Sequence, residues 1–120
     1  MKLVKYGGYM AELGLVRIIN STHGSNQHKH NFKIEIIFKG SIKDSMVEGI
    51  DFHDIKPQVN NVIDKIDGVY IDNILNTRAT VENIAIYIIK ELKKIKSVDS
   101  VTVWEAEDRY AKVYKEEIIK

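Results

Sequence analysis

The sequence predicts an α+β domain with the element order ββααββ, in which two helices pack on one face of an antiparallel four-stranded sheet. Apolar and polar residues alternate near both ends of the chain, as they do in strands that bury one face. Between these segments, apolar residues recur at the spacing of amphipathic helices. Because a chain of 120 residues, 44% of them hydrophobic, is long enough for one core but short for two, we expect residues 1–120 to form one domain.

The first two strands are predicted at residues 12–20 (ELGLVRIIN) and 30–38 (HNFKIEIIF). The first is rich in branched apolar residues, and the second alternates four apolar residues with polar ones. These four residues are Phe32, Ile34, Ile36 and Phe38. The turn-like segment STHGSNQ between the strands is short enough for an antiparallel hairpin. A polar loop is expected over residues 39–49.

The first helix is predicted where apolar residues recur at helical spacing from Phe52 to Ile66. It is expected to begin near Asp54, because proline is tolerated in the first turn of a helix and Pro57 follows closely. Residues 67–79 have no sustained period, and we expect them to form a structured loop.

The second helix is predicted over residues 80–96 (TVENIAIYIIKELKKIK), where apolar residues form one stripe. Thr80 is its expected N-cap, and Glu82 lies near the positive end of the helix dipole. Two short strands are then predicted at residues 100–106 and 111–116, on either side of a polar turn.

The composition argues against several kinds of partner. Eighteen Lys and Arg residues against 17 Asp and Glu residues give a net charge of +1, so we expect no nucleic-acid partner. No apolar run approaches the roughly 18 residues of a membrane span, and the first 13 residues lack the apolar centre of a signal peptide. We therefore expect no membrane partner and a cytoplasmic location. The absence of cysteine excludes disulfides, thiolate ligands and a cysteine nucleophile.

Three of the four histidines fall in one stretch, at His23, His28 and His30. Residues i and i+2 of a strand project from the same face, so His28 and His30 can converge on one ion, and His23 lies near the end of the partner strand. Three neutral imidazoles with one open position are typical of a catalytic zinc site. A polar turn whose histidines only form hydrogen bonds remains the alternative at this point.

Six segments, INSTH, HKHNFKIEI, GIDFHDIK, YIDNILN, ATVENIA and VTVWEA, occur in this order. In their order and spacing they resemble the motifs of the 6-pyruvoyltetrahydropterin synthase and 6-carboxytetrahydropterin synthase family. The resemblance extends from about Val16 to Tyr114 and implies a tunnelling-fold subunit. It also implies assembly through the sheets, as a homohexamer built from two trimers with active sites between subunits.

The resemblance also implies roles for individual residues. His23, His28 and His30 would bind Zn2+, and Asp72 would be catalytic. The remaining matched residues would contact the substrate: Glu105, Thr80 and Asn73. Glu105 would anchor the pterin, since a carboxylate can accept hydrogen bonds from the N3–H and 2-amino groups together.

This sequence departs from the family pattern at the proton-transfer residues. The family's cysteine corresponds to Gly24, the histidine that follows its aspartate corresponds to Asn73, and the threonine after its anchoring glutamate corresponds to Ala106. An amide cannot accept a proton near neutral pH. The candidates for a replacement base are Ser25, His53, Glu107 and Asp108.

Three hypotheses follow. In the first, the chain is a zinc-dependent lyase that eliminates triphosphate from dihydroneopterin triphosphate or a related reduced pterin, either with non-standard acid/base residues or by slow turnover in which the metal alone acidifies a bound hydroxyl. In the second, it binds zinc and a pterin without conversion, as a binding module or as one partner in a mixed oligomer. In the third, the histidines hold no metal and the chain is an assembling scaffold. For a lyase, the resemblance favours the deazaguanine route to queuosine or archaeosine.

Overall fold

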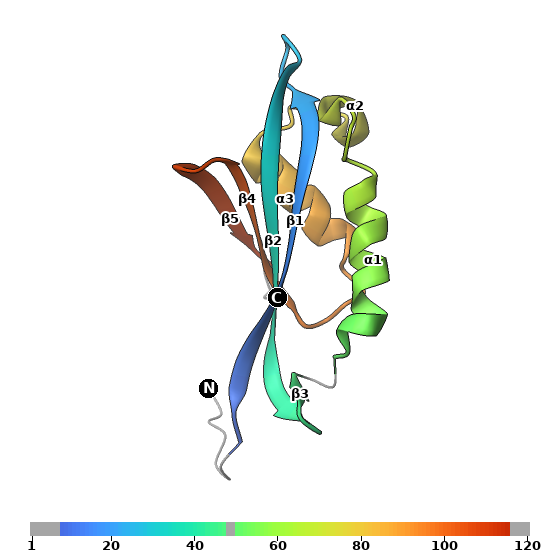
Figure 1. Cartoon of the computed structure of the whole chain (residues 1–120), viewed down its shortest axis with the longest axis vertical. Helices are drawn as coiled ribbons and strands as arrows, with labels where there is room; N and C mark the ends of the chain where they lie inside the picture. The colour runs from blue at the N-terminus through green and yellow to red at the C-terminus, as the bar shows by residue number, and fades with distance from the viewer. Residues whose placement is uncertain (1–7, 48–49, 116–120) are drawn as a thin grey trace, which may run out of the picture.

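A computed structural model describes residues 8–47 and 50–115. Its strands are β1 (Met10–His23), β2 (His28–Lys43), β3 (Met46–Val47), β4 (Val98–Ala106) and β5 (Arg109–Tyr114), and its helices are α1 (Phe52–Asp64), α2 (Ile71–Leu75) and α3 (Val81–Glu91). All the strand pairs are antiparallel, in the order β1-β2-β4-β5, with β3 added to the end of β2. The helices cover one face of this sheet (Figure 1), so the predicted α+β class is confirmed.

The two longest strands, β1 and β2, form one long hairpin. Its register is continuous from the pair Met10 and Ser41 to the pair His23 and His28. Strand β4 pairs with β2 only from Lys33 to Phe38, with a register shift after Ile37. The three clustered histidines precede Lys33, so the hairpin end that carries them projects beyond the region where β2 pairs with β4.

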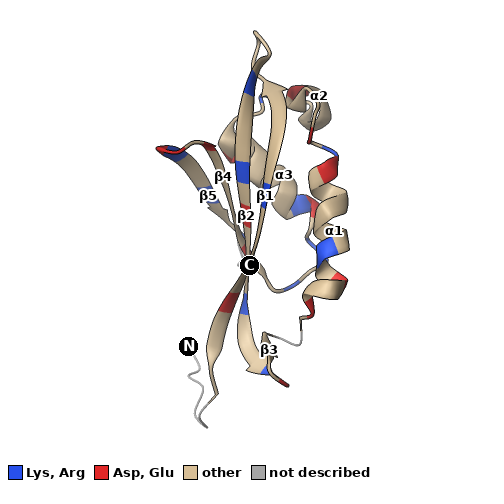
Figure 2. Ribbon diagram, in the orientation of Figure 1, with Lys and Arg blue, Asp and Glu red and all other residues tan. Residues whose placement is uncertain are grey.

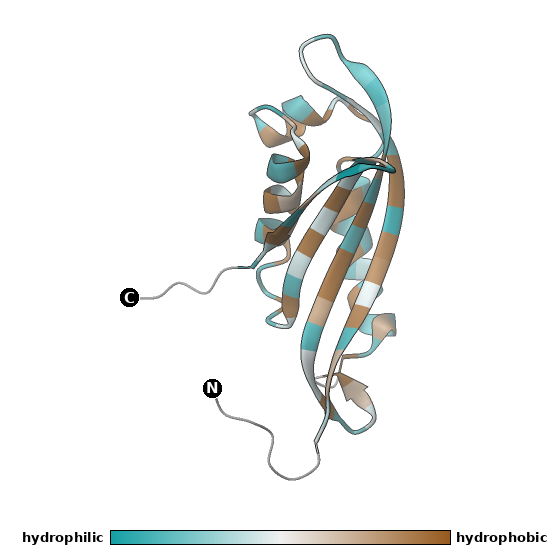
Figure 3. Cartoon of the chain, turned by 90° about the vertical axis from the view of Figure 1, so that its left-hand side faces the viewer, coloured by the Kyte–Doolittle hydropathy of each residue, from teal (hydrophilic) through white to brown (hydrophobic). Residues whose placement is uncertain are grey.

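The core lies between the sheet and the helices. The four alternating residues predicted for β2, Phe32, Ile34, Ile36 and Phe38, are all buried. They meet apolar residues of α1 and α3 such as Val59, Ile63, Ile84 and Ile88. Hydrophobic and hydrophilic bands alternate along the strands, as expected when each strand buries one side (Figure 3). Burial of each such side chain contributes about 1.5–3 kcal/mol.

Two segments predicted as loops contain regular structure. Strand β2 continues to Lys43 and turns back into β3, whose Val47 pairs with Ile42. Glu48 and Gly49, the end of that predicted loop, lie outside the described residues. Within residues 67–79, the five-residue helix α2 buries Ile71 and ends at Leu75, and its C-cap Asn76 adopts a left-handed conformation with φ 59°.

The helix ends also differ from the prediction. Helix α1 begins at Phe52, because the Asp51 side chain accepts a hydrogen bond from the backbone N–H of His53 at 2.9 Å and caps the first turn. Pro57 consequently lies beyond the first turn. Helix α3 has Thr80 as its N-cap, as predicted, but ends at Glu91 instead of Lys96.

The last predicted strand also differs at both of its ends. Strand β5 begins at Arg109 and ends at Tyr114, whereas the prediction began at residue 111. Glu116, the last residue of that prediction, lies outside the described residues.

Charged residues of both signs are distributed over the strands and α1 (Figure 2). This distribution agrees with the net charge of +1. Among the described residues, no helix is both long and apolar enough to span a membrane.

Candidate metal centre

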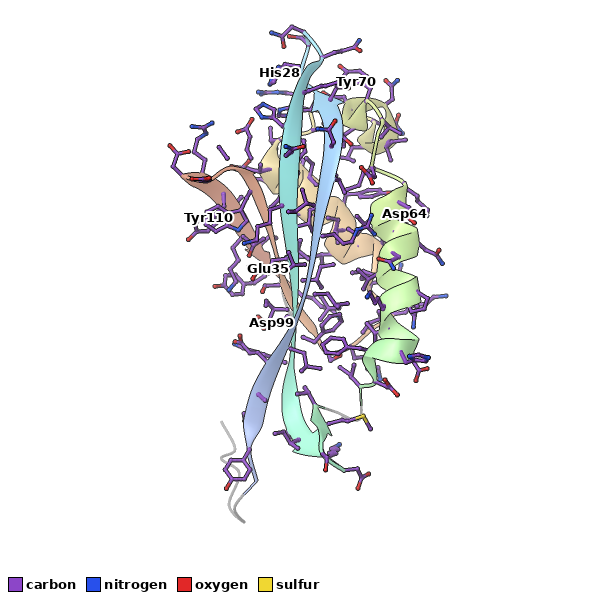
Figure 4. All side chains as sticks on the ribbon, in the orientation of Figure 1. His28, Glu35, Asp64, Tyr70, Asp99 and Tyr110 are labelled. Atoms are coloured by element: carbon purple, nitrogen blue, oxygen red, sulfur yellow. The ribbon has the colours of Figure 1, made fainter. Side chains whose placement is uncertain are left out.

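The three clustered histidines lie at the projecting end of the β1–β2 hairpin. His23 is the last residue of β1 and pairs directly with His28, the first residue of β2. His30 follows two residues later, and its ring centroid lies 4.7 Å from that of His28. Figure 4 places His28 at this end of the hairpin, near α2. The predicted convergence of the three side chains is therefore present in the structure.

A fourth side chain completes the group. Glu105, near the end of β4, brings Oε2 to 3.3 Å from Nε2 of His23 and to 3.3 Å from Nε2 of His30. One potential ligand atom from each of the three histidines and from Glu105 lies within 4.8 Å of all the others. Imidazole nitrogens and a carboxylate oxygen are ligands that zinc accepts.

Hydrogen bonds fix the orientation of two of the imidazoles. Nδ1 of His23 lies 2.7 Å from the carbonyl oxygen of Ala79, and Nδ1 of His28 lies 2.8 Å from Oδ1 of Asn26. Because both partners are oxygens that accept hydrogen bonds, Nδ1 carries the proton in each neutral ring. Nε2 then keeps a free lone pair, which is the arrangement that metal-binding histidines commonly adopt.

Nε2 of His23 is the polar atom that most directly indicates a ligand. It is buried, and within residues 8–47 and 50–115 it makes no hydrogen bond, since Oε2 of Glu105 at 3.3 Å is itself an acceptor and cannot donate to its lone pair. Leaving a buried polar group unpaired costs about 1–3 kcal/mol. A cation bound between Nε2 of His23 and the neighbouring donors would satisfy it, so the residues present fit a divalent metal ion.

The surroundings of His30 favour its neutral form. Burial lowers the pKa of His30 below its ordinary value of 6.5, against the opposing influence of the Glu105 carboxylate. The neighbouring His23 and His28 lower this pKa further. A neutral ring is the form that binds a metal ion.

Two clefts meet at this cluster. The first has a volume of about 610 Å³ and lies between the hairpin turn, α2 and the start of α3, with His23, His28 and Glu105 in its wall. The second has a volume of about 720 Å³ and is bordered by His30, Glu105, Trp104 and two lysines, Lys29 and Lys33. Glu105 borders both clefts, so a ligand in either one can reach it.

The structure places the other residues that the resemblance selected as follows. Asp72 and Thr80 border the first cleft. Oδ1 of Asp72 accepts a hydrogen bond from the backbone N–H of Gly24 at 3.0 Å, and Oγ1 of Thr80 accepts one from the N–H of Asn83 at 3.1 Å. Asn73 is exposed, and it is not among the described residues that border either cleft.

The candidates for a replacement base are also separated. Ser25 borders the first cleft and Glu107 the second. His53 lies in the exposed first turn of α1, and Asp108 lies in the β4–β5 turn, where its Oδ1 is 3.2 Å from Nη1 of Arg109. Neither of these two borders the described walls of the two clefts.

Sequence reasoning assigned no site role to four polar side chains of the first cleft, those of Asn26, Tyr70, Arg78 and Glu82. The sequence predicts only a helix-dipole role for Glu82, but this residue of the first turn of α3 also borders the cleft. Arg78 is the only Lys or Arg among the described residues of this wall. Tyr70 precedes the five-residue helix α2 and Arg78 lies in the loop before α3, and neither residue belongs to a periodic pattern, so the sequence held no signal that could have identified them.

Comparison with known proteins agrees with this fold. Residues 15–116 match the family model described as 6-pyruvoyl tetrahydropterin synthase. A curated relative from Archaeoglobus fulgidus, provisionally named 6-carboxy-5,6,7,8-tetrahydropterin synthase, is 37% identical over 87 residues, which cover 72% of this chain and 74% of the relative.

Solved structures show the same fold at low sequence identity. The 6-pyruvoyl tetrahydropterin synthase of Caenorhabditis elegans has a TM-score of 0.78 and 19% identity, covering 90% of this chain and 97% of its own. That of Plasmodium vivax has a TM-score of 0.66 and 17% identity, covering 89% of this chain and 98% of its own. Two variants of the P. vivax protein, with a glutamate changed to cysteine or to alanine, are described as catalytic residue mutants.

Proposed function

Because the chain belongs to the 6-pyruvoyl tetrahydropterin synthase family, we propose that it is a zinc-dependent lyase that acts on dihydroneopterin triphosphate or a related reduced pterin. The observation that carries this proposal is the convergence of His23, His28 and His30 around the buried Nε2 of His23, which makes no hydrogen bond among the described residues. An unpaired imidazole nitrogen is costly unless a ligand occupies the site.

In this proposal the three histidines hold the metal through their Nε2 atoms. The Nδ1 contacts to Ala79 and Asn26 support this choice for His23 and His28. When bound, Zn2+ would act as a Lewis acid that increases the acidity of the substrate's side-chain hydroxyl groups and adjacent carbons.

Glu105 is the proposed pterin anchor. Its carboxylate borders both clefts, and its Oε1 lies 3.8 Å from Nε of Arg109. Two oxygens can accept the paired N–H donors of a pterin ring, which gives both affinity and a fixed ring orientation. Glu105 would therefore turn from the neighbouring histidines toward the ring when substrate binds.

Asp72 is the proposed proton-transfer residue, and Thr80 a substrate contact, because both border the cleft beside the histidines. A cysteine is not essential for such a role, since the P. vivax synthase has a glutamate as a catalytic residue. Arg78 is the proposed contact for the phosphate groups, because a guanidinium binds phosphate oxygens in pairs. Asn73 would contact substrate only in the cleft of a neighbouring subunit, because its side chain is exposed outside the described wall.

We also propose a cytoplasmic homohexamer, built as a dimer of trimers, in which the whole chain acts as one domain. Strands β1 and β5 are the edges of the sheet and expose large hydrophobic side chains, including Val16, Ile18, Tyr110 and Tyr114. Exposed edges and apolar faces of this kind are typical of assembling subunits. The name of the A. fulgidus relative supports the deazaguanine route, to queuosine or archaeosine, as the pathway.

A second candidate function is pterin binding without conversion. It is favoured by the complete absence of cysteine and by the exposed amide at Asn73, which leave two family proton-transfer positions without a titratable group. In that case the chain would be a binding module or one partner in a mixed oligomer.

One assay separates the two functions. Zinc-loaded protein is incubated with dihydroneopterin triphosphate, and released triphosphate is measured beside an Asp72→Asn variant. The lyase proposal predicts release by the wild type and a large loss in the variant. If zinc is bound but no triphosphate or altered pterin forms, while the pterin still binds in a Glu105-dependent manner, the binding function is correct.

A further inference from the structure

We propose that Tyr70 and Asp72 position the metal ligand His28. Their side chains form hydrogen bonds with the backbone carbonyl and N–H groups of Gly24 and so fix the hairpin turn, residues 24–27, beside His28. This inference rests on the zinc site proposed above. It gives Asp72 a positioning role that is separate from proton transfer, and it gives Tyr70 a role that the family resemblance did not supply.

The backbone of Gly24 is held by two side chains from one segment. Oδ1 of Asp72 accepts a hydrogen bond from its N–H at 3.0 Å, and the hydroxyl of Tyr70 donates one to its carbonyl oxygen at 2.9 Å. The same carbonyl also accepts from the N–H of Gln27 at 3.0 Å and closes the turn. Figure 4 labels Tyr70 and His28 at the same end of the molecule, beside α2.

The turn is in direct contact with the imidazole of His28. Asn26 belongs to the turn, and its side-chain oxygen lies 2.8 Å from Nδ1 of that ring. Gly24 has φ 85°, and a Cβ atom added there would lie 3.1 Å from Cε1 of His28. A displacement of the turn would therefore move both Asn26, the hydrogen-bond partner of the His28 ring, and Gly24, which limits the space beside that ring.

His28 depends on the turn more than His23 does. His23 is buried, and Ala79 fixes its Nδ1. His28 is exposed, so packing does little to orient its ring. The ligand with the least packing is thus the one beside the turn that Tyr70 and Asp72 hold.

These two side-chain contacts are not needed to attach the α2 segment to the sheet. The backbone N–H of Thr22 donates to the carbonyl of Val69 at 3.0 Å, and that of Gly68 donates to the carbonyl of Asn20 at 3.0 Å. Removal of the Tyr70 hydroxyl or the Asp72 carboxylate should therefore loosen the turn while the fold persists. Loss of a group that orients a metal ligand typically lowers metal affinity about 10- to 100-fold.

The test measures the zinc dissociation constant by chelator competition for Tyr70→Phe, Asp72→Ala and Asp72→Asn. We expect zinc binding to weaken about 10- to 100-fold in Tyr70→Phe and Asp72→Ala. We expect Asp72→Asn to bind zinc like the wild type, because an amide oxygen can still accept from Gly24, even though the variant loses proton transfer. Matched controls are Tyr110→Phe and Asp54→Ala, both at exposed positions of other elements.

The melting temperature of each metal-free variant distinguishes positioning from general stability. The proposal expects little change in melting temperature for Tyr70→Phe and Asp72→Asn, even if Asp72→Ala folds poorly. Wild-type zinc affinity in Tyr70→Phe and in a folded Asp72→Ala would overturn the positioning role and leave the proposed function intact. A wild-type protein that binds no zinc would overturn the zinc site itself, and this inference with it.

Discussion

Nε2 of His23 and Oε2 of Glu105 lie 3.3 Å apart, although they come from opposite ends of the chain and from two strands that do not pair with each other. Nε2 of His30 is equally close to the same oxygen. The proposed zinc site therefore leaves two roles for Glu105, to bind a pterin beside the metal or to bind the metal itself. The two roles predict different consequences when the carboxylate is removed.

The Glu105→Gln substitution tests the pterin-anchor role. We expect zinc content to remain near that of the wild type, because three histidines suffice as protein ligands of a catalytic zinc. Pterin affinity should fall about 10- to 150-fold, since a hydrogen bond to a charged group contributes about 1.5–3 kcal/mol. Zinc analysis and calorimetric titration with a pterin measure the two effects. Loss of zinc with unchanged pterin affinity would instead identify Glu105 as a metal ligand.

The Phe32→Ala substitution tests the support beneath the site. Phe32 is fully buried, and its ring centroid lies 5.1 Å from that of His23 and 5.6 Å from that of His30. We expect the free energy of unfolding of the metal-free protein to fall by about 3–5 kcal/mol in urea denaturation. Phe52→Ala, at a position that is 39% exposed, should cost clearly less. Equal losses in the two variants would contradict the assigned core.

The Thr80→Ala substitution tests the cap of α3. We expect a loss of about 1 kcal/mol in unfolding free energy, because the Oγ1 contact to the N–H of Asn83 is removed. Thr77→Ala, in the exposed loop before the helix, is the control. A weaker pterin affinity in Thr80→Ala would additionally support the proposed substrate contact, whereas unchanged stability would contradict the capping role.

The Asn73→His substitution tests whether neighbouring subunits share an active site. Imidazole can transfer a proton near neutral pH, whereas an amide cannot. We expect triphosphate release by the assembled protein to rise about 100-fold, at the lower end of what general acid–base groups contribute. Because residue 73 lies outside the described walls of the clefts of its own chain, the gain should disappear on dilution to monomers. An unchanged rate in the assembled protein would argue against a shared site.

The sheet and the clustering of the histidines could be predicted because they depend on local periodicity. The alternation that buries Phe32 and Phe38 also places His28 and His30 on one face of β2. In any strand, residues i and i+2 point to the same face. The same reasoning located the cap at Thr80, since capping depends on residues only a few positions apart.

The parts that could not be predicted depend on longer-range contacts or on very short elements. The hydrogen bond from Gly24 to Asp72 joins residues 48 positions apart, and no sequence pattern around either residue predicts this contact. Helix α2 has five residues, too few for a helical period to be visible. The position of Glu105 against His23 follows from the register between β2 and β4, which hydrophobic alternation leaves undetermined.

The most direct test of the zinc centre is the metal content of the protein purified under metal-replete conditions, measured by mass spectrometry of the native protein and by elemental analysis. The account predicts about one zinc ion per chain in the wild type and in His53→Ala, and almost none in His23→Ala. A wild-type protein that remains without zinc, or a His23→Ala variant that keeps it, would contradict the account.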